Sequence, residues 1–238
     1  MAVPTTLRIP IGNRLLASLP PAEYEVLLPH LERVHLPLDT MLYHAGDRIQ
    51  YAYFPVSGMA SLLSITEDGE AIEVAMVGNE GMVDVGCFLR VNIMPYQSVI
   101  QIAADALKIR ADLLRREFDR GGRLQDVLLR YTHALLTHVS QSAVCNRYHK
   151  MDSRLCRWLL VARDRVKSDT FNLTQESIAQ MMGAPRTGVT ASACRLQDKG
   201  LIRYRRGKIT IVNRQKLEES SCECYGVVRE KIDQFLVA

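Results

Sequence analysis

The pattern of apolar and polar positions divides the chain into a strand-rich first half and a helical second half. From about Val34 onward, glycines such as Gly46, Gly58 and Gly69 separate short apolar runs. Between Arg110 and Gly183 the only glycines are Gly121 and Gly122, and apolar residues recur at three- and four-residue spacing, which is the spacing of amphipathic helices. This change predicts an α+β chain whose strands precede most of its helices.

The strand-rich half predicts a small antiparallel β-barrel or jelly roll at residues 13–120. The runs MASLLSIT and AIEVAMV flank EDGE, whose Asp68-Gly69 pair suits a tight hairpin turn. QSVIQIAADALKI adds two further strands, and many short strands with regular turns are typical of such barrels. Proline-punctuated short helices in NRLLASLPPAEYEVLLPHL precede the strands.

A long helix is predicted at residues 121–149, with apolar residues in the heptad pattern of a coiled coil. This stripe could pack on the chain's own barrel. We favour a two-fold contact between two copies, because the stripe is longer than one small barrel face needs. The predicted dimer seam consists of Leu124, Leu128, Tyr131, Leu135 and His138.

The segment LTQESIAQMMGAPRTGVTASACRLQDKGLI predicts two short helices joined by a tight turn. Thr174 suits a helix cap, Gly183 the left-handed residue that ends a helix, and Pro185 the start of the next one. This is the helix-turn-helix arrangement, in which the start of the second helix contacts base edges. A generic helical pair with a basic loop is the alternative. The expected DNA-contacting residues here are Gln175, Arg186, Thr187 and Thr190.

The remaining segments complete a winged helix-turn-helix domain at residues 150–215 and a C-terminal helical extension at 216–238. MDSRLCRWLLVARDRVKS predicts an amphipathic helix with Trp158 on its apolar face, and SDTFNL predicts a polar break. GLIRYRRGKITIV predicts a hairpin that turns at Arg206-Gly207 and presents basic side chains to phosphates. These side chains are Arg203, Arg205, Arg206 and Lys208.

Charge separates the two halves of the chain. Residues 1–150 hold 14 Lys and Arg against 16 Asp and Glu, a net charge of −2. The last 88 residues hold 16 Lys and Arg against 10 Asp and Glu, a net charge of +6. Positive charge concentrated in one segment is typical of phosphate binding, so we interpret the second half as DNA-binding.

Several other functions are not predicted. No apolar run approaches the ~18 residues of a membrane span, and the N-terminal stretch lacks the apolar core of a signal peptide, so we expect a cytoplasmic protein without a membrane partner. Cys222 and Cys224 stand too close together for a zinc knuckle, and no second Cys or His pair lies nearby in sequence, so no metal is expected. No nucleophile signature or phosphate-cradling glycine loop predicts an enzyme.

From about residue 15 to residue 215 the chain resembles the Crp/Fnr family of bacterial transcription regulators. The resemblance rests on the helix-turn-helix segment and on MLYHAGD, YFPVSGMASLL and VGNEGMVDVGCFL in the barrel. It implies a cyclic-nucleotide-binding-type sensor barrel and a dimer formed through the long helix. The implied partners are double-stranded DNA, a second copy of the chain and RNA polymerase.

The barrel departs from the family members that bind cyclic AMP. Those members carry Gly-Glu-Leu and then Arg-Ser/Thr-Ala, where this chain has Val83-Asp84-Val85 and Gln97-Ser98-Val99. A buried cyclic phosphate needs a fixed positive partner, which a neutral Gln97 does not supply. We therefore expect an effector other than cyclic AMP and no cofactor; a cyclic-nucleotide-responsive regulator is the alternative.

Other departures concern the remaining sensor types and the target site. The first cysteine is Cys87, so the N-terminal cysteine cluster of the family's iron–sulfur sensors is absent, and no histidine stands out as a haem ligand. The recognition helix has Arg186, Thr187 and Ala191 where cyclic AMP-responsive members have Arg, Glu and Arg. We therefore expect a different DNA target site.

Overall fold

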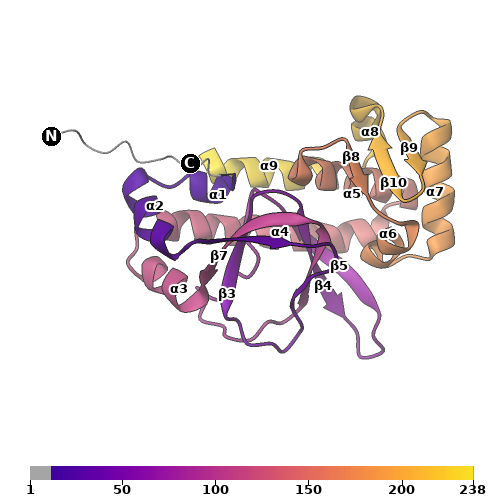
Figure 1. Cartoon of the computed structure of the whole chain (residues 1–238). Helices are drawn as coiled ribbons and strands as arrows, with labels where there is room; N and C mark the ends of the chain where they lie inside the picture. The colour runs from indigo at the N-terminus through magenta and orange to yellow at the C-terminus, as the bar shows by residue number, and fades with distance from the viewer. Residues whose placement is uncertain (1–11, 238) are drawn as a thin grey trace.

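A computed structural model describes residues 12–237. A β-barrel domain forms one end of the molecule and a helix-turn-helix domain the other, with the long helix α4 passing between them (Figure 1). The last helix, α9 (Cys224–Val237), runs back along α4 toward the barrel (Figure 1). This arrangement confirms the predicted α+β class. None of the described helices is both long and apolar enough to span a lipid bilayer.

The barrel is a jelly-roll-like pair of antiparallel sheets, with strand orders β1-β7-β3 and β2-β6-β4-β5. The hairpin predicted at Asp68-Gly69 is present, because Ile65 pairs with Ala71 and Gly69 has a positive φ of 85°. The strands are β1 (Glu32–Leu36), β2 (Met41–Tyr43), β3 (Tyr51–Pro55), β4 (Met59–Ile65), β5 (Ala71–Val77), β6 (Gln97–Ile102) and β7 (Ala104–Arg110). The short helices around them are α1 (Arg14–Ala17), α2 (Pro21–Leu27), the 3-10 turn η1 (Leu28–His30) and α3 (Ala111–Asp119).

Helix α4 (Arg123–Tyr148) packs directly on the barrel. The hydroxyl of Tyr131 donates a hydrogen bond of 2.8 Å to the carbonyl of Met82. A Cβ atom at Gly81 would lie 2.3 Å from the Tyr131 ring, so only glycine allows the loop and the helix to approach this closely. The helix and the barrel therefore share one core.

The heptad stripe of α4 faces the chain itself and not a second copy. Leu124, Leu128, Tyr131 and His138 are buried within the single chain, and Leu128 has no exposed surface at all. Leu135 is half-buried against the same core. A side chain already covered by its own chain cannot contact a partner, so the four buried residues do not form the predicted dimer seam. A contact through the half-buried Leu135 stays a prediction.

The predicted DNA-binding domain begins with α5 (Met151–Val166), whose predicted apolar face is buried, and burial extends around the helix beyond that face. All eight residues from Leu155 to Ala162 are buried, because α5 lies between the barrel strands and helices α7 and α8. SDTFNL contains strand β8 (Thr170–Asn172) where a polar break was predicted. The other elements are α6 (Gln175–Met182), α7 (Arg186–Asp198), β9 (Ile202–Arg205) and β10 (Lys208–Ile211).

The predicted C-terminal helical extension consists of two helices. Helix α8 (Arg214–Ser220) packs on α5. Residues 221–223 are not helical, and α9 begins after them. The ring of Phe235, near the end of α9, packs edge-on against Tyr131 with 5.5 Å between ring centroids. Arg14 and Asp233 form an ion pair of 3.2 Å, so the last helix reaches the first helix of the chain.

Candidate nucleic-acid interface

Local sequence signals set the ends of the two helices of the helix-turn-helix. The Thr174 side chain accepts a hydrogen bond of 3.0 Å from the Ser177 amide and caps α6. Gly183 ends α6 in the left-handed conformation with φ 55°, and Ile72 of the barrel leaves no space for a Cβ atom there. Pro185 stands immediately before α7, so the recognition helix begins at Arg186.

The start of α7 points its side chains into solvent. Arg186 and Thr187 are exposed, whereas Val189, Ala193 and Leu196 form the buried inner face. The Arg186 guanidinium lies 3.5 Å from Glu176 of α6, and both side chains are about two-thirds exposed. So loose an ion pair at the surface contributes little stability and leaves Arg186 available to a base.

Thr190 is less exposed to solvent than Arg186 and Thr187. Its side chain is half-buried, and its hydroxyl lies within hydrogen-bonding distance of Gln175 Oε1 and of the Arg186 carbonyl. A hydroxyl has one proton, so it donates to one of these acceptors at a time. Thr190 and Gln175 therefore connect the two helices of the motif.

The predicted wing forms a two-residue hairpin that turns at Arg206 and Gly207. Both residues have positive φ, of 50° and 74°, as a tight turn between twisted strands requires. Arg205 pairs directly with Lys208 across the hairpin. Strand β8 pairs with β10 on its other side, so the wing is a three-stranded sheet.

One face of this sheet carries positive charge without counter-ions. Arg203, Arg205 and Lys208 alternate with the buried residues Ile202 and Ile209, so all three project from the same outer face. Within residues 12–237, none of these three side chains, nor that of Arg206, has a carboxylate within 4.0 Å. Like charges facing each other across a hairpin destabilise it, so this face fits an external anion.

Asp152 and Arg195 form a contact that sequence reasoning missed. Arg195 Nε lies 2.8 Å from Asp152 Oδ2, and its Nη2 contacts the other carboxylate oxygen. The bond from Arg195 lowers the pKa of Asp152. The pair fixes the recognition helix to α5, and no local pattern announces it because 43 residues separate the partners.

The barrel residues of the altered nucleotide motif do not form a cationic site. Val83, Asp84 and Ser98 are buried, and Val85 and Gln97 are half-buried. Asp84 Oδ1 accepts a hydrogen bond of 3.0 Å from the Gly86 amide, whereas Asp84 Oδ2 and the Ser98 hydroxyl have no partner in the described part of the chain. Burial raises the pKa of Asp84 to about 7, and none of the ion pairs of the described residues involves it.

The structure also brings two further residues to the Cys222 and Cys224 pair. Cys145 and His149, at the end of α4, lie beside these cysteines, and the four ligand atoms are within 4.8 Å of one another. The sequence argument against a metal assumed that no second pair was near, and in space this assumption is incorrect. The missed signal is the four-residue spacing of Cys145 and His149, which places both on one helical face.

Comparisons with known proteins agree with this architecture. Residues 33–120 match the cyclic nucleotide-binding domain family, and residues 153–220 match the Crp-like helix-turn-helix domain family. The global nitrogen regulator of Nostoc sp. is 23% identical over 180 residues, which are 71% of this chain and 80% of that protein.

Solved structures share the fold at low sequence identity. A transcriptional regulator of the Crp/Fnr family from Eubacterium rectale has a TM-score of 0.67 at 19% identity, covering 88% of this chain and 98% of that one. FixK2 from Bradyrhizobium japonicum has a TM-score of 0.67 at 16% identity, covering 81% and 98%. The two matched domains, in this order and joined by the long helix, identify the chain as a transcription regulator of the Crp/Fnr family.

Proposed function

We propose that this protein is a homodimeric regulator that binds a palindromic promoter site through Arg186 and the basic wing. The proposal is supported by two features that lie on the same domain. The recognition helix begins with an exposed Arg186, and the adjacent wing presents basic side chains that have no carboxylate within 4.0 Å in the described part of the chain. The first suits a base edge and the second suits phosphates.

Each group has a defined task in this proposal. Arg186 donates two hydrogen bonds to O6 and N7 of a guanine in the major groove. The wing residues Arg203, Arg205 and Lys208 contact the DNA backbone, which fixes the register of the recognition helix without reading sequence. Thr187, exposed one position further on, lies within the same groove.

A homodimer is supported by a second stripe on α4, on the face away from the barrel. Leu129 and Leu136 are seven residues apart and expose 49% and 60% of their surface in the single chain. Val144 and Tyr148 continue this exposed surface toward the end of the helix. Large apolar side chains repeated at heptad spacing on an exposed helix fit a parallel contact with a second copy.

Two such domains would read a palindrome. A two-fold axis between the α4 helices places the recognition helices in successive major grooves, roughly 34 Å apart. A promoter-bound dimer lies beside RNA polymerase, which is the further partner that we propose. The proposed DNA target also locates the protein in the cytoplasm of a bacterial cell.

The proposed effector is not a cyclic nucleotide. Gln97 is neutral at the position where the resemblance expects an arginine, and the nearby Asp84 is buried without a cationic partner among the described residues. A cyclic phosphate would therefore lose its water without gaining an opposite charge. Millimolar cyclic AMP should leave the melting temperature unchanged, whereas a clear upward shift would favour the cyclic-nucleotide-responsive alternative.

Selection from random double-stranded DNA tests the proposed DNA binding. Wild type should enrich a palindromic site, and Arg186→Ala should lose preference at one base pair of each half-site at a cost of about 1–3 kcal/mol. Arg120→Ala, an exposed arginine that pairs with Glu117 in the barrel domain, is the matched control. The proposal would be contradicted if wild type and Arg186→Ala both enriched the same non-palindromic site.

A further inference from the structure

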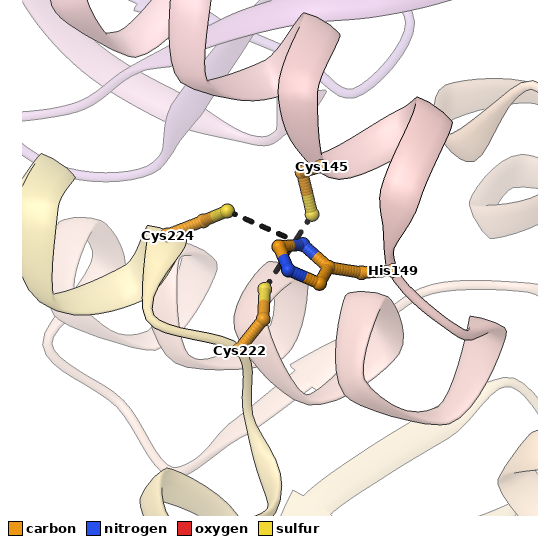
Figure 2. A group of neighbouring side chains, drawn as sticks. All are labelled: Cys145, His149, Cys222 and Cys224. Atoms are coloured by element: carbon orange, nitrogen blue, oxygen red, sulfur yellow. Dashed lines mark hydrogen bonds between the residues drawn. The ribbon is translucent and has the colours of Figure 1, made fainter.

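Four side chains from two distant parts of the sequence point toward one another beside the end of α4 (Figure 2). Cys145 belongs to the last turns of α4, and His149 immediately follows that helix. Cys222 lies in the break between α8 and α9, and Cys224 is the first residue of α9. None of the four lies in the segments 33–120 and 153–220 that match the known domain families.

The distances between these ligand atoms fit a single tetrahedral ion. Zinc bonds of about 2.3 Å to sulfur and 2.0–2.1 Å to nitrogen require tetrahedral edges of about 3.8 Å between sulfurs and about 3.6 Å between sulfur and nitrogen. The Sγ atoms of Cys145 and Cys222 are 3.5 Å apart, and Cys224 Sγ is 3.4 Å from His149 Nδ1. An iron–sulfur cluster has several metal and sulfide atoms between its ligands and needs a wider spacing.

The orientation of His149 is the one that a ligating histidine takes. Its Nδ1 faces the cysteines, while its Nε2 lies 3.2 Å from a carboxylate oxygen of Glu223. Metal-bound histidines usually donate their other N–H to a carboxylate, which fixes the ring and its tautomer. Glu223, the one residue between the two cysteines, is therefore placed to fix the ring of His149.

The charges around the cluster also fit. Three thiolates and a neutral imidazole around a divalent ion carry a net charge of −1. Arg157 of α5 is 94% buried, and its Nε and Nη1 have no hydrogen-bond partner among residues 12–237. Arg157 lies close enough to Cys145 for its positive charge to act on that sulfur, so it can balance the charge of the site.

A neighbouring amide contacts the sulfur of Cys224. Gln141 Nε2 on α4 donates a hydrogen bond of 3.1 Å to Cys224 Sγ. An N–H donor satisfies one lone pair of a metal-bound thiolate and leaves another for the ion. Helix α4 and the residue that follows it thus contribute two ligands and one supporting donor to the site.

We propose that Cys145, His149, Cys222 and Cys224 bind one zinc ion that fastens the C-terminal helix α9 to the end of α4. The ion is structural, because four protein ligands leave no open position for a substrate. It fixes the first residue of α9, and the contact between Phe235 and Tyr131 fixes the other end. The ligand His149 lies in the two-residue connection, 149–150, through which the long helix passes into the DNA-binding domain.

Metal analysis of the whole protein, purified without added metal or chelator, tests the proposal directly. We expect one zinc per chain and, after exchange with Co²⁺, the intense visible absorption of tetrahedral cobalt with thiolate ligands. Iron with inorganic sulfide in place of zinc would overturn it. A Cys145–Cys222 disulfide found by mass spectrometry of the freshly purified protein, without bound metal, would also overturn it.

Variants locate the ion. Cys222→Ser and His149→Ala should lose the bound zinc, whereas Cys194→Ser, which changes the exposed cysteine of α7, should retain it. Glu223→Gln keeps all four ligands and should weaken zinc binding about 10–100-fold in a chelator competition. Full zinc content in both ligand variants would overturn the assignment, even if zinc were present in wild type.

A protease test reports on the role of the ion. Removal of zinc by a chelator should make the segment after Ser220 more sensitive to a protease, and zinc should restore protection. The domain-family segment 153–220 should remain protected under both conditions. Equal cleavage of α9 with and without the ion would contradict the fastening role.

Discussion

The hydroxyl of Thr190 lies 2.7 Å from Oε1 of Gln175, so the second helix of the helix-turn-helix is tied to the first residue of the first. Thr190→Val removes the hydroxyl and nearly keeps the shape of the side chain. We expect specific DNA binding to weaken by about 0.5–1.5 kcal/mol, because the Gln175 side chain loses its support. Fluorescence anisotropy with the selected site measures this change.

The control for this prediction is Thr132→Val on α4. The Thr132 hydroxyl donates a hydrogen bond of 2.8 Å to the carbonyl of Leu128, four residues earlier, as Thr190 can to Arg186. This variant should leave DNA affinity unchanged. If Thr190→Val binds as tightly as wild type, the contact with Gln175 does not position the reading surface.

Arg205 and Lys208 face each other across the wing, and loss of either charge should change the salt dependence of DNA binding. For Arg205→Ala, the slope of log K against log salt should fall in magnitude by about 0.9, on specific and nonspecific DNA alike. The free energy of unfolding should not decrease, because the change removes a like-charge pair. An unchanged slope would mean that Arg205 makes no phosphate contact.

Leu136 should contact its copy in a second chain. In Leu136→Glu the charge replaces a side chain that is 60% exposed in the single chain, so the fold should persist while the dimer dissociates. Sedimentation at micromolar concentration measures the dissociation. Leu89→Glu, at another exposed leucine in the barrel domain, should remain dimeric.

A contrasting change at Leu128 separates the two faces of α4. Leu128→Ala should reduce the free energy of unfolding by about 2–5 kcal/mol, because this side chain is fully buried against the barrel. It should not weaken the contact between chains. Dissociation by Leu128→Ala without loss of stability would restore the heptad stripe as the dimer seam.

Glu73 should make the stability of the protein decrease with rising pH. It accepts hydrogen bonds from Ser61 and, at 2.8 Å, from Trp158 Nε1, and burial raises its pKa to about 7. Between its ordinary pKa of about 4.3 and about 7 the folded state holds a proton that the unfolded state releases. This contribution is therefore complete at low pH and is lost as pH rises through about 7.

Glu73→Gln removes this titration and keeps two polar atoms at the site. Urea unfolding at pH 5 and pH 8, followed through Trp158, the one tryptophan of the chain, measures both proteins. The difference in stability, wild type minus variant, should decrease from pH 5 to pH 8. A constant difference would show that Glu73 has an ordinary pKa in the folded protein.

The helix-turn-helix and the wing could be predicted because their signals are local. Thr174, Gly183 and the Arg206-Gly207 turn each act within a few residues of their place in the sequence. The same holds for the β4–β5 hairpin. Strand β8 escaped prediction because it has only three residues, two of them polar, and its strand conformation depends on pairing with β10.

The faces of α4 could not be distinguished in this way. Heptad spacing identifies a stripe that will be covered, but it does not say what covers it. Leu124 and Tyr131 meet the barrel, while Leu129 and Leu136 have the same seven-residue spacing and face solvent. The metal-type cluster was missed for a related reason, since Cys145 and Cys222 are 77 positions apart in the sequence.

Because Cys145 and Cys222 meet, the DNA-binding domain is a closed loop of chain whose entry and exit lie at one point. The domain is held by this junction and by the contacts of α5 and α6 with the barrel strands. A tilt of α4 therefore carries both ends of the loop together, and the DNA-binding domain with them. In a dimer, a small change of angle between the two α4 helices would thus be magnified into a change of spacing between the two recognition helices.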